Sequence, residues 1–320
     1  MRKDVSYYNV WEDKIMLFNQ QKRVTLREIL ESGPVLMPNI FDCVSAKVME
    51  QVGFKALNIP CANVAASLIG LPDLGMLDFD ELLTTVDHVY NMSPLPIMVD
   101  IGCGFGNEIN VLRSCERMVK AGASALVLDD RRFQPAFGSQ QELTEREEFL
   151  TKLRAAYHVL EGSGCMLVAR TAAAKICGVD EAIERCRMAV EAGADLTFVE
   201  GIEQKTDLER ISKSVDGWKM FEMGAVKVAT YEELVDMGYQ LITMEFAMAG
   251  ANEYMMAYGA KSKEDMSDIY AVEHSILPSG ARMTALGNHE MFGANDWLGL
   301  GASFSDHSQL KFAGAFLPKE

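Results

Sequence analysis

The chain has 320 residues, of which 49% are hydrophobic, and its formal net charge is −16 at pH 7. This length and composition allow one large hydrophobic core or two ordinary domains. The excess of acids argues against nucleic acid and anionic membranes as partners, because phosphate contacts need clustered Lys and Arg, whereas a few local cations suffice for a small anionic substrate.

The sequence before the first buried strand predicts a helical lead-in to the main domain. The first residues, "MRKDVSYYNVWEDK", lack the apolar core of a signal peptide. No run of about 18 apolar residues predicts a membrane span. The seven cysteines show no C-x-x-C spacing, which is typical of reduced thiols, so we expect a cytoplasmic protein.

Four segments share one layout, in which a helical stretch ends at a glycine and a short apolar run follows: "VGFKALNIP", "AGASALVLD", "AGADLTFVE" and "MGYQLITME". Glycine can take the left-handed conformation that closes a helix. The apolar runs "PVLMPN", "PIMVD", "CMLVAR" and "WKMFEM" complete eight β–α units from Val35 to about Tyr258. This predicts an α/β fold, a closed (β/α)8 barrel within residues 1–258, with an open doubly wound sheet as the alternative.

The tail after Gly259 breaks this alternation. The stretch "SKEDMSDIYAVEHSI" predicts a further helix, and the glycine-rich segment from Pro278 to Ser308 predicts irregular structure. We therefore expect residues 259–320 to form a C-terminal extension that packs on the barrel or on a neighbouring subunit.

In a barrel of this kind the active site lies at the C-terminal ends of the strands. Here those ends carry mostly acids, with one arginine among them: Asp100, Asp129, Asp130, Arg170, Glu200, Glu222 and Glu245. Converging carboxylates repel one another unless a cation lies between them, which favours a hard divalent ion such as Mg2+ or Mn2+. Arg170 is the candidate to hold a substrate carboxylate or phosphonate, while helix capping is the alternative role for any single acid.

The third strand leads into the glycine-rich stretch "VDIGCGFGNEINV", Val99–Val111. The dinucleotide pattern G-x-G-x-x-G fails, because Asn107 stands where the third glycine would fall, and the Gly-Lys-Ser/Thr of a phosphate loop is absent. The glycines, Gly104 among them, predict a sharp turn beside Asp100 that approaches a ligand closely. A loop without a ligand is the alternative.

Several ordered motifs resemble those of the isocitrate lyase and phosphoenolpyruvate mutase superfamily, over about Val35 to Tyr258. They are "GLPDLGMLDFDEL" after the second strand, "VDIGCGFGNEINVLRSCERMVKAGASALVLDD", "ARTAAA" and "FVEGI". The sequence is similar to a divergent, methylisocitrate lyase-like member. The resemblance implies a (β/α)8 barrel that binds Mg2+ and handles enolates of 2-oxo acids.

The resemblance also implies roles for particular residues. The metal-site acids of the family correspond to Asp73, Asp100 and Asp129. The residues implied in binding the substrate are Cys61, Ala62, Asn63, Asp73 and Arg170, and Arg170 and Glu200 are also implied in the chemistry.

The departures from the family pattern lie mainly on the loops. Gly102 stands at the second loop acid, Asp129 is shorter than the usual Glu, and the Asp of A-R-T-D-A is an alanine. The lyases' catalytic Cys falls within "PAFGS", residues 135–139, where Phe137 stands instead. The lysine and Asn-Ser of the mutases and hydrolases are missing as well. Candidates for the proton donor are then Ser139, Glu200 and an ordered water.

Two arginines after the fourth strand, Arg131 and Arg132, are not part of the resemblance. They lie close to the strand-four acids in the sequence and could hold a second anionic group. The alternative is that they pair on the surface with the acids Glu142, Glu145 and Glu147.

These features predict a Mg2+-dependent lyase that cleaves or forms a C–C bond in a small 2-oxo or 2-hydroxy acid through an enolate. A phosphonomutase or a C–P or C–C hydrolase at the same site is one alternative, and a degenerate barrel that binds a ligand without turnover is another. By the same resemblance we expect a homotetramer or homodimer.

Overall fold

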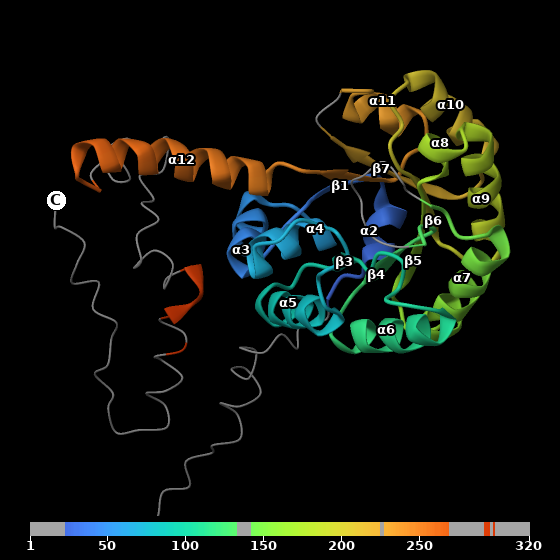
Figure 1. Ribbon diagram of the computed structural model, residues 1–320, viewed down its shortest axis with the longest axis horizontal. Helices are drawn as coiled ribbons and strands as arrows, with labels where there is room; N and C mark the ends of the chain where they lie inside the picture. Colours follow the sequence, from blue (N-terminus) through green and yellow to red (C-terminus); the bar gives the residue numbers. More distant parts are fainter. Residues whose placement is uncertain (1–22, 133–141, 225–226, 269–290, 295–296, 298–320) are drawn as a thin grey trace, which may run out of the picture. The chain divides into compact units, whose positions relative to one another are not determined.

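The computed structural model describes residues 23–132, 142–224, 227–268, 291–294 and 297, drawn in colour in Figure 1. Two compact units divide the chain, Met1–Ala249 and Gly250–Glu320. Helix α12 (Ala247–Asp265) crosses this division, and none of its residues is buried. The boundary expected after residue 258 and the packing of the tail stay predictions.

Eight parallel strands lie in the order β1-β8-β7-β6-β5-β4-β3-β2. They are β1 (Val35–Pro38), β2 (Leu57–Ile59), β3 (Ile97–Asp100), β4 (Ala125–Asp129), β5 (Met166–Thr171), β6 (Leu196–Val199), β7 (Trp218–Met223) and β8 (Leu241–Met244). The two ends of the row meet at a bridge between Asn39 and Asn58, where the Ile40 N–H donates to the Asn58 carbonyl at 2.8 Å. These contacts close the sheet, which confirms the (β/α)8 barrel and excludes the open sheet.

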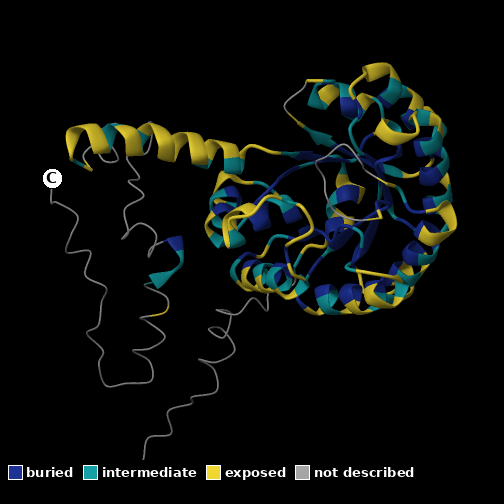
Figure 2. Ribbon diagram, in the orientation of Figure 1, coloured by how far each residue is buried: buried dark blue, intermediate teal, exposed yellow. Residues whose placement is uncertain are grey.

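Helices surround the strands in an outer ring (Figure 1). They are α3 (Cys43–Val52), α4 (Cys61–Val64), the π-helical turn η2 (Ala65–Ile69), α5 (Phe79–Met92), α6 (Glu108–Lys120), α7 (Arg146–Leu160), α8 (Ala173–Ile176), α9 (Val179–Glu191), α10 (Lys205–Ser214) and α11 (Tyr231–Asp236). Figure 2 shows buried residues on the strands and alternating buried and exposed residues along these helices, as expected for amphipathic helices on a sheet. Within the described part of the chain, no helix has both the length and the hydropathy needed to cross a membrane.

The lead-in predicted before the barrel contains helix α2 (Leu26–Ser32). Thr25 caps it with a reciprocal capping box to Glu28. Leu26 and Leu30 are buried in the same apolar cluster as Val35 and Met37 of β1. Helix α2 therefore packs against the apolar residues that fill the barrel interior.

The four glycines that closed the predicted helices all have positive φ angles: Gly53 (100°), Gly122 (97°), Gly193 (100°) and Gly238 (87°). At Gly122 a Cβ atom would also lie 2.0 Å from the Tyr90 ring. The same layout recurs in the sequence because the same turn recurs in the structure. The chain leaves each of these helices in a left-handed turn before it enters the next strand.

Side chains alternate along each strand, so one set fills the barrel interior. The apolar interior cluster includes Met98, Val127, Val168, Phe198 and Met220. Polar residues follow this apolar interior at or just beyond the C-terminal end of each strand, and we call them the polar ring: Asn39, Asn58, Asp100, Asp129, Arg170, Glu200, Glu222 and Glu245. The polar ring supplies the charged and hydrogen-bonding side chains at the end of the barrel where active sites of this fold lie.

Candidate active site

Arg170 lies between two carboxylates of the polar ring. Its Nη1 donates to Asp100 Oδ2 at 2.7 Å, and its Nε and Nη2 donate to Asp129 Oδ2 at 2.8 and 2.6 Å. Burial alone would lower the pKa of Arg170, but the charges of Asp100, Asp129 and Glu200 outweigh it and raise the pKa well above its ordinary value. The described residues thus use three of the five guanidinium N–H groups and leave one on each Nη atom.

Arg131 is buried beside Arg170, with 3% of its surface exposed. Its Nη1 donates to Asp129 Oδ2 and its Nη2 to Glu200 Oε1, both at 2.5 Å. The surface pairing considered for this residue is therefore wrong, whereas its neighbour Arg132 does approach Glu142, at 3.8 Å. The sequence placed Arg131 near the acids but gave no sign that its side chain turns inward.

Asp129 has both carboxylate oxygens engaged by the two arginines. Its Oδ1 accepts the Arg131 backbone N–H at 2.8 Å, and its Oδ2 accepts from both guanidinium groups. Burial would raise the pKa of Asp129, but Arg170 and Arg131 lower it below its ordinary value. Asp129 thus anchors two guanidinium groups through Oδ2 and the neighbouring backbone through Oδ1.

Asp73 follows helix η2 and has the opposite character. It is half-buried, and its Oδ1 is buried without a hydrogen-bond partner. Burial, followed by the charge of Asp100, raises its pKa. A carboxylate oxygen in this state is one that a bound cation or a proton would satisfy.

The donor set suits Mg2+ better than a metal that needs a full set of protein ligands. Among the described residues, no three Asp, Glu, His or Cys side chains form a metal-binding group. Mg2+ keeps several waters and commonly takes only one or two carboxylates. Asp73, with its unpartnered oxygen, and Asp100 fit this requirement, and the metal role implied for Asp129 stays a prediction.

The glycine loop after β3 shapes the surroundings of Asp100. Asp100 Oδ1 accepts the Gly102 N–H at 2.8 Å, and the Gly102 carbonyl accepts the Asp129 N–H at 2.8 Å. At Gly104, φ is +86° and a Cβ would lie 2.4 Å from Val111 Cγ2. The glycine at 104 is therefore required for packing against α6, and its contact with a ligand stays a prediction.

Residues 61–63 form the first turn of α4, beside the polar ring. The Cys61 thiol donates to the Asp100 carbonyl at 3.0 Å, and Asn63 Nδ2 donates to Glu245 Oε2 at 3.0 Å. Ala62 is half-buried between them. The structure thus brings these three residues to the same end of the barrel as Asp100, while their contact with substrate stays a prediction.

A second polar cluster joins strands β1, β2, β7 and β8. Asn39 Nδ2 donates to Glu222 Oε1 at 3.0 Å and to Glu245 Oε2 at 2.9 Å, while Asn58 Nδ2 donates to Asn39 Oδ1 at 2.7 Å. Burial raises the pKa of Glu222. In the sequence both glutamates are strand-end acids, while Asn39 and Asn58, which join them here, carry no motif that points to this contact.

Asp130 lies behind the ring, on the side of α9. Its carboxylate accepts from Thr171 Oγ1 at 2.5 Å, from the Ala172 N–H at 2.9 Å and from Arg185 Nη1 at 3.2 Å. Its carbonyl accepts the Thr144 N–H at 2.8 Å. Asp130 therefore ties β4 to β5, to α9 and to the chain that returns at residue 144.

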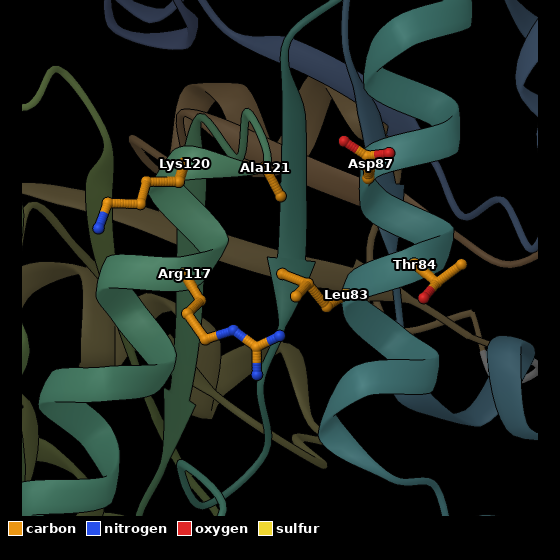
Figure 3. Close-up of a pocket in the computed structure, with 6 residues that line it drawn as sticks. All are labelled: Leu83, Thr84, Asp87, Arg117, Lys120 and Ala121. Carbon is orange, nitrogen blue, oxygen red and sulfur yellow. The ribbon is translucent and has the colours of Figure 1, made fainter.

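Two further places in the molecule lie apart from the polar ring or outside the described residues. Ser139 lies outside the described residues. A surface hollow between α5 and α6 is lined by Leu83, Thr84, Asp87, Arg117, Lys120 and Ala121, which Figure 3 draws as sticks. This hollow contains none of the predicted site residues, so the polar ring remains the candidate active site.

Carboxylates gathered around a buried arginine at the C-terminal strand ends of a (β/α)8 barrel are typical of barrel enzymes, whose active sites lie at this end. The family model described as phosphoenolpyruvate phosphomutase matches residues 26–265, and the chain belongs to this family.

Named relatives agree with this assignment. The chain is 35% identical over 225 residues to the chloroplastic carboxyvinyl-carboxyphosphonate phosphorylmutase of Arabidopsis thaliana, a match that covers 68% of this chain and 66% of that protein, just under two thirds. It is 32% identical over 222 residues to the 2,3-dimethylmalate lyase of Eubacterium barkeri, with coverage of 68% and 77%. A crystal structure of 2,3-dimethylmalate lyase matches with a TM-score of 0.79 at 26% identity, covering 88% of this chain and 95% of that one. The family is enzymatic and includes carbon–carbon lyases.

Proposed function

We propose that the protein is a Mg2+-dependent lyase that makes or breaks a C–C bond next to the carboxylate of a small 2-oxo or 2-hydroxy acid, through an enolate. The observation that carries the proposal is Arg170, which two carboxylates hold in place while one N–H remains on each Nη atom. A guanidinium fixed in this way offers its remaining donors in a set geometry, as recognition of a substrate carboxylate requires.

The residues that would hold Mg2+, or Mn2+ in its place, are Asp100 and Asp73. The proposal rests on the unpartnered, buried Oδ1 of Asp73 and on the charge of Asp100 near it. When bound, the ion supplies positive charge opposite the negative charge that develops on the substrate.

The surrounding residues prepare this site. Asp129 aligns the guanidinium groups of Arg131 and Arg170, and Glu200 accepts a hydrogen bond from Arg131. We propose that the first turn of α4, Cys61–Asn63, faces a substrate oxygen. A substrate anion would meet Arg170 before Arg131, because Arg131 has less exposed surface.

A phosphonomutase or C–P hydrolase is the second candidate, supported by the name of the Arabidopsis thaliana relative. The enolate site is common to both reactions, and what differs is the group transferred to or from the enolate carbon. A degenerate barrel that binds a ligand without turnover is the remaining alternative.

The test is turnover by the purified protein with Mg2+ on a panel of 2-hydroxy di- and tricarboxylates, oxaloacetate and phosphonopyruvate. Proton NMR follows 2-oxo acid release and phosphorus NMR follows phosphate. If the proposal is right, one of the carboxylic acids without phosphorus releases a 2-oxo acid, and EDTA abolishes this activity. Turnover of phosphonopyruvate alone would favour the second candidate, and no turnover together with no Mg2+ binding would favour the degenerate barrel.

We also propose that the protein works in the cytoplasm as a homotetramer or homodimer. The first part rests on its seven cysteines, all of which are described and none of which is paired in a disulfide. Light scattering coupled to size-exclusion chromatography measures the mass of the assembly against the 35.4 kDa of one chain.

A further inference from the structure

We propose that Glu222 is the catalytic acid and base that carries the proton to and from the enolate carbon. This inference rests on the proposed function and assigns the proton donor, for which the sequence suggested only Ser139, Glu200 and water.

Strand β7 places Glu222 inside the barrel mouth. Met220 pairs with Phe198 of β6 and with Leu241 of β8, and all three belong to the apolar interior. Glu222 is two residues further along the same face, opposite Thr243, and it feels the charges of Arg170, Glu200 and Asp100. Its carboxyl group therefore faces the place where Arg170 would hold a substrate.

Asn39 fixes the orientation of the Glu222 carboxyl. The side-chain oxygen of Asn39, Oδ1, accepts from Asn58 Nδ2 at 2.7 Å. The side-chain nitrogen of Asn39, Nδ2, must therefore point the other way. The two amide hydrogens go to Glu222 Oε1 and Glu245 Oε2, at 3.0 and 2.9 Å. Among the described residues nothing donates to Glu222 Oε2, which leaves this oxygen available to carry a proton.

The other acids of the ring are committed to cations or to solvent. Asp100 and Asp129 accept from Arg170, and Glu200 accepts from Arg131. Glu245 is exposed and accepts a second amide hydrogen bond from Asn63. Glu222 is half-buried and has no guanidinium partner among the described residues, so it is the ring acid whose proton is easiest to retain.

Burial is the main influence on the pKa of Glu222. Burial raises its pKa, and the nearby charges of Glu200 and Asp100 add to this effect. The Asn39 hydrogen bond and the charge of Arg170 act in the opposite direction. The net effect is a pKa above the ordinary value of a glutamate, so Glu222 keeps its proton more readily than an exposed glutamate does.

The proton step balances without any other reactant. In the cleavage direction the O–H bond of Glu222 breaks as the electron pair of the enolate forms a C–H bond, which leaves a Glu222 carboxylate. The proton lost from the substrate hydroxyl goes to solvent, and Glu222 takes a proton from solvent before the next turnover. In the reverse direction the carboxylate removes the same carbon-bound proton.

The test is exchange with D2O of the proton bound to the enolate carbon, followed by proton NMR in the presence of Mg2+. The protons followed are the methyl protons of pyruvate, for a reaction in which the 2-oxo acid becomes the enolate, and the protons beside the carboxylate of the other product, for cleavage of a 2-hydroxy acid. Glu222→Gln should lower the exchange rate by about 100-fold or more, the range of general acid–base catalysis. Glu222→Asp should retain part of it. The wild-type rate should rise with pH through the Glu222 pKa, because exchange begins with the carboxylate form, and Glu222→Gln should lose this rise.

Oxalate affinity in the presence of Mg2+ shows whether the Glu222→Gln site is intact, and it should remain as in the wild type. Glu50→Gln is the control, because Glu50 lies on α3 outside the polar ring and pairs with Lys47 at 2.8 Å, so neither exchange nor oxalate affinity should change. If Glu222→Gln exchanges at the wild-type rate and with the wild-type pH profile, the role of Glu222 is wrong but the proposed function stands. If the variant loses exchange and oxalate affinity together, Glu222 is a structural residue and its catalytic role is wrong. Absence of exchange in the wild type would overturn the proposed function itself.

Discussion

At the scale of single residues, the site depends on how each carboxylate is partnered. Asp129 accepts from two guanidinium groups, Asp100 accepts from one guanidinium and one backbone N–H, and Asp73 has a buried oxygen without a partner. The three aspartates therefore differ in role. Asp129 holds the guanidinium groups of Arg131 and Arg170 in place, while Asp73 and Asp100 are suited to bind a metal ion.

Asp100→Asn tests the metal role. The amide keeps an oxygen that can accept the Gly102 N–H but removes the charge, so Mg2+ affinity should fall by more than about tenfold, or ~1.4 kcal/mol. Arg170 keeps its contacts with Asp129, so the melting temperature without metal should change little. Calorimetric titration with Mg2+ and a thermal melt measure the two quantities, and a large loss of stability with unchanged Mg2+ affinity would make Asp100 a structural residue.

Arg170→Lys tests the substrate role while keeping the charge. Lysine offers a point charge in place of the fork, so oxalate binding should weaken by about 1–3 kcal/mol, the scale of a charged hydrogen bond. Arg117→Lys is the matched control, because Arg117 pairs with Asp80 at 2.6 Å on the outer ring. Oxalate affinity within error of wild type in Arg170→Lys would mean that Arg170 serves only its acidic neighbours.

At the scale of elements, the turn between β3 and α6 joins the site to the fold. Asp100 ends β3, Gly102 bonds to both Asp100 and Asp129, and Asn107 caps α6. The glycine spacing that raised the question of a phosphate loop is therefore explained by the backbone of this turn. Its conformation sets where the Asp100 side chain lies.

Gly104→Ala should destabilise the protein through this turn. The new Cβ would meet Val111 at 2.4 Å and would also occupy a left-handed conformation, for a combined cost of about 1–3 kcal/mol. Gly162→Ala has a similar φ of +75° with open space around the new Cβ, so it measures the conformational cost alone. Chemical denaturation should give a larger loss for Gly104→Ala, and equal losses would remove the packing argument.

The helices and strands were more predictable from the sequence than the side-chain contacts of the site were. The regular recurrence of short apolar runs and of glycines at helix ends predicted every strand and hence the barrel. Both signals are local, because each strand must be apolar to be buried and each helix must end in a left-handed turn. The inward turn of Arg131 and the Asn39 link between Glu222 and Glu245 depend on which strands become neighbours and on the register between them. Local patterns carry no information about either, so these contacts required the structure.

At the scale of the whole molecule, one barrel end gathers acids from the ends of five strands in a chain whose net charge is −16. Two buried arginines offset Asp100, Asp129 and Glu200, which leaves the polar ring with an excess of negative charge. An anionic substrate entering this site needs a further cation beside Arg170. We therefore expect the metal and the anion to bind together.

Calorimetric titration of the wild-type protein with oxalate, with and without Mg2+, tests this claim most directly. Oxalate resembles the enolate of a 2-oxo acid and can contact Arg170 and a metal at once. Mg2+ should tighten oxalate binding by at least about tenfold, and by thermodynamic reciprocity oxalate should tighten Mg2+ binding by the same factor. Oxalate affinity that is equal with and without Mg2+, or absent in both cases, would contradict it.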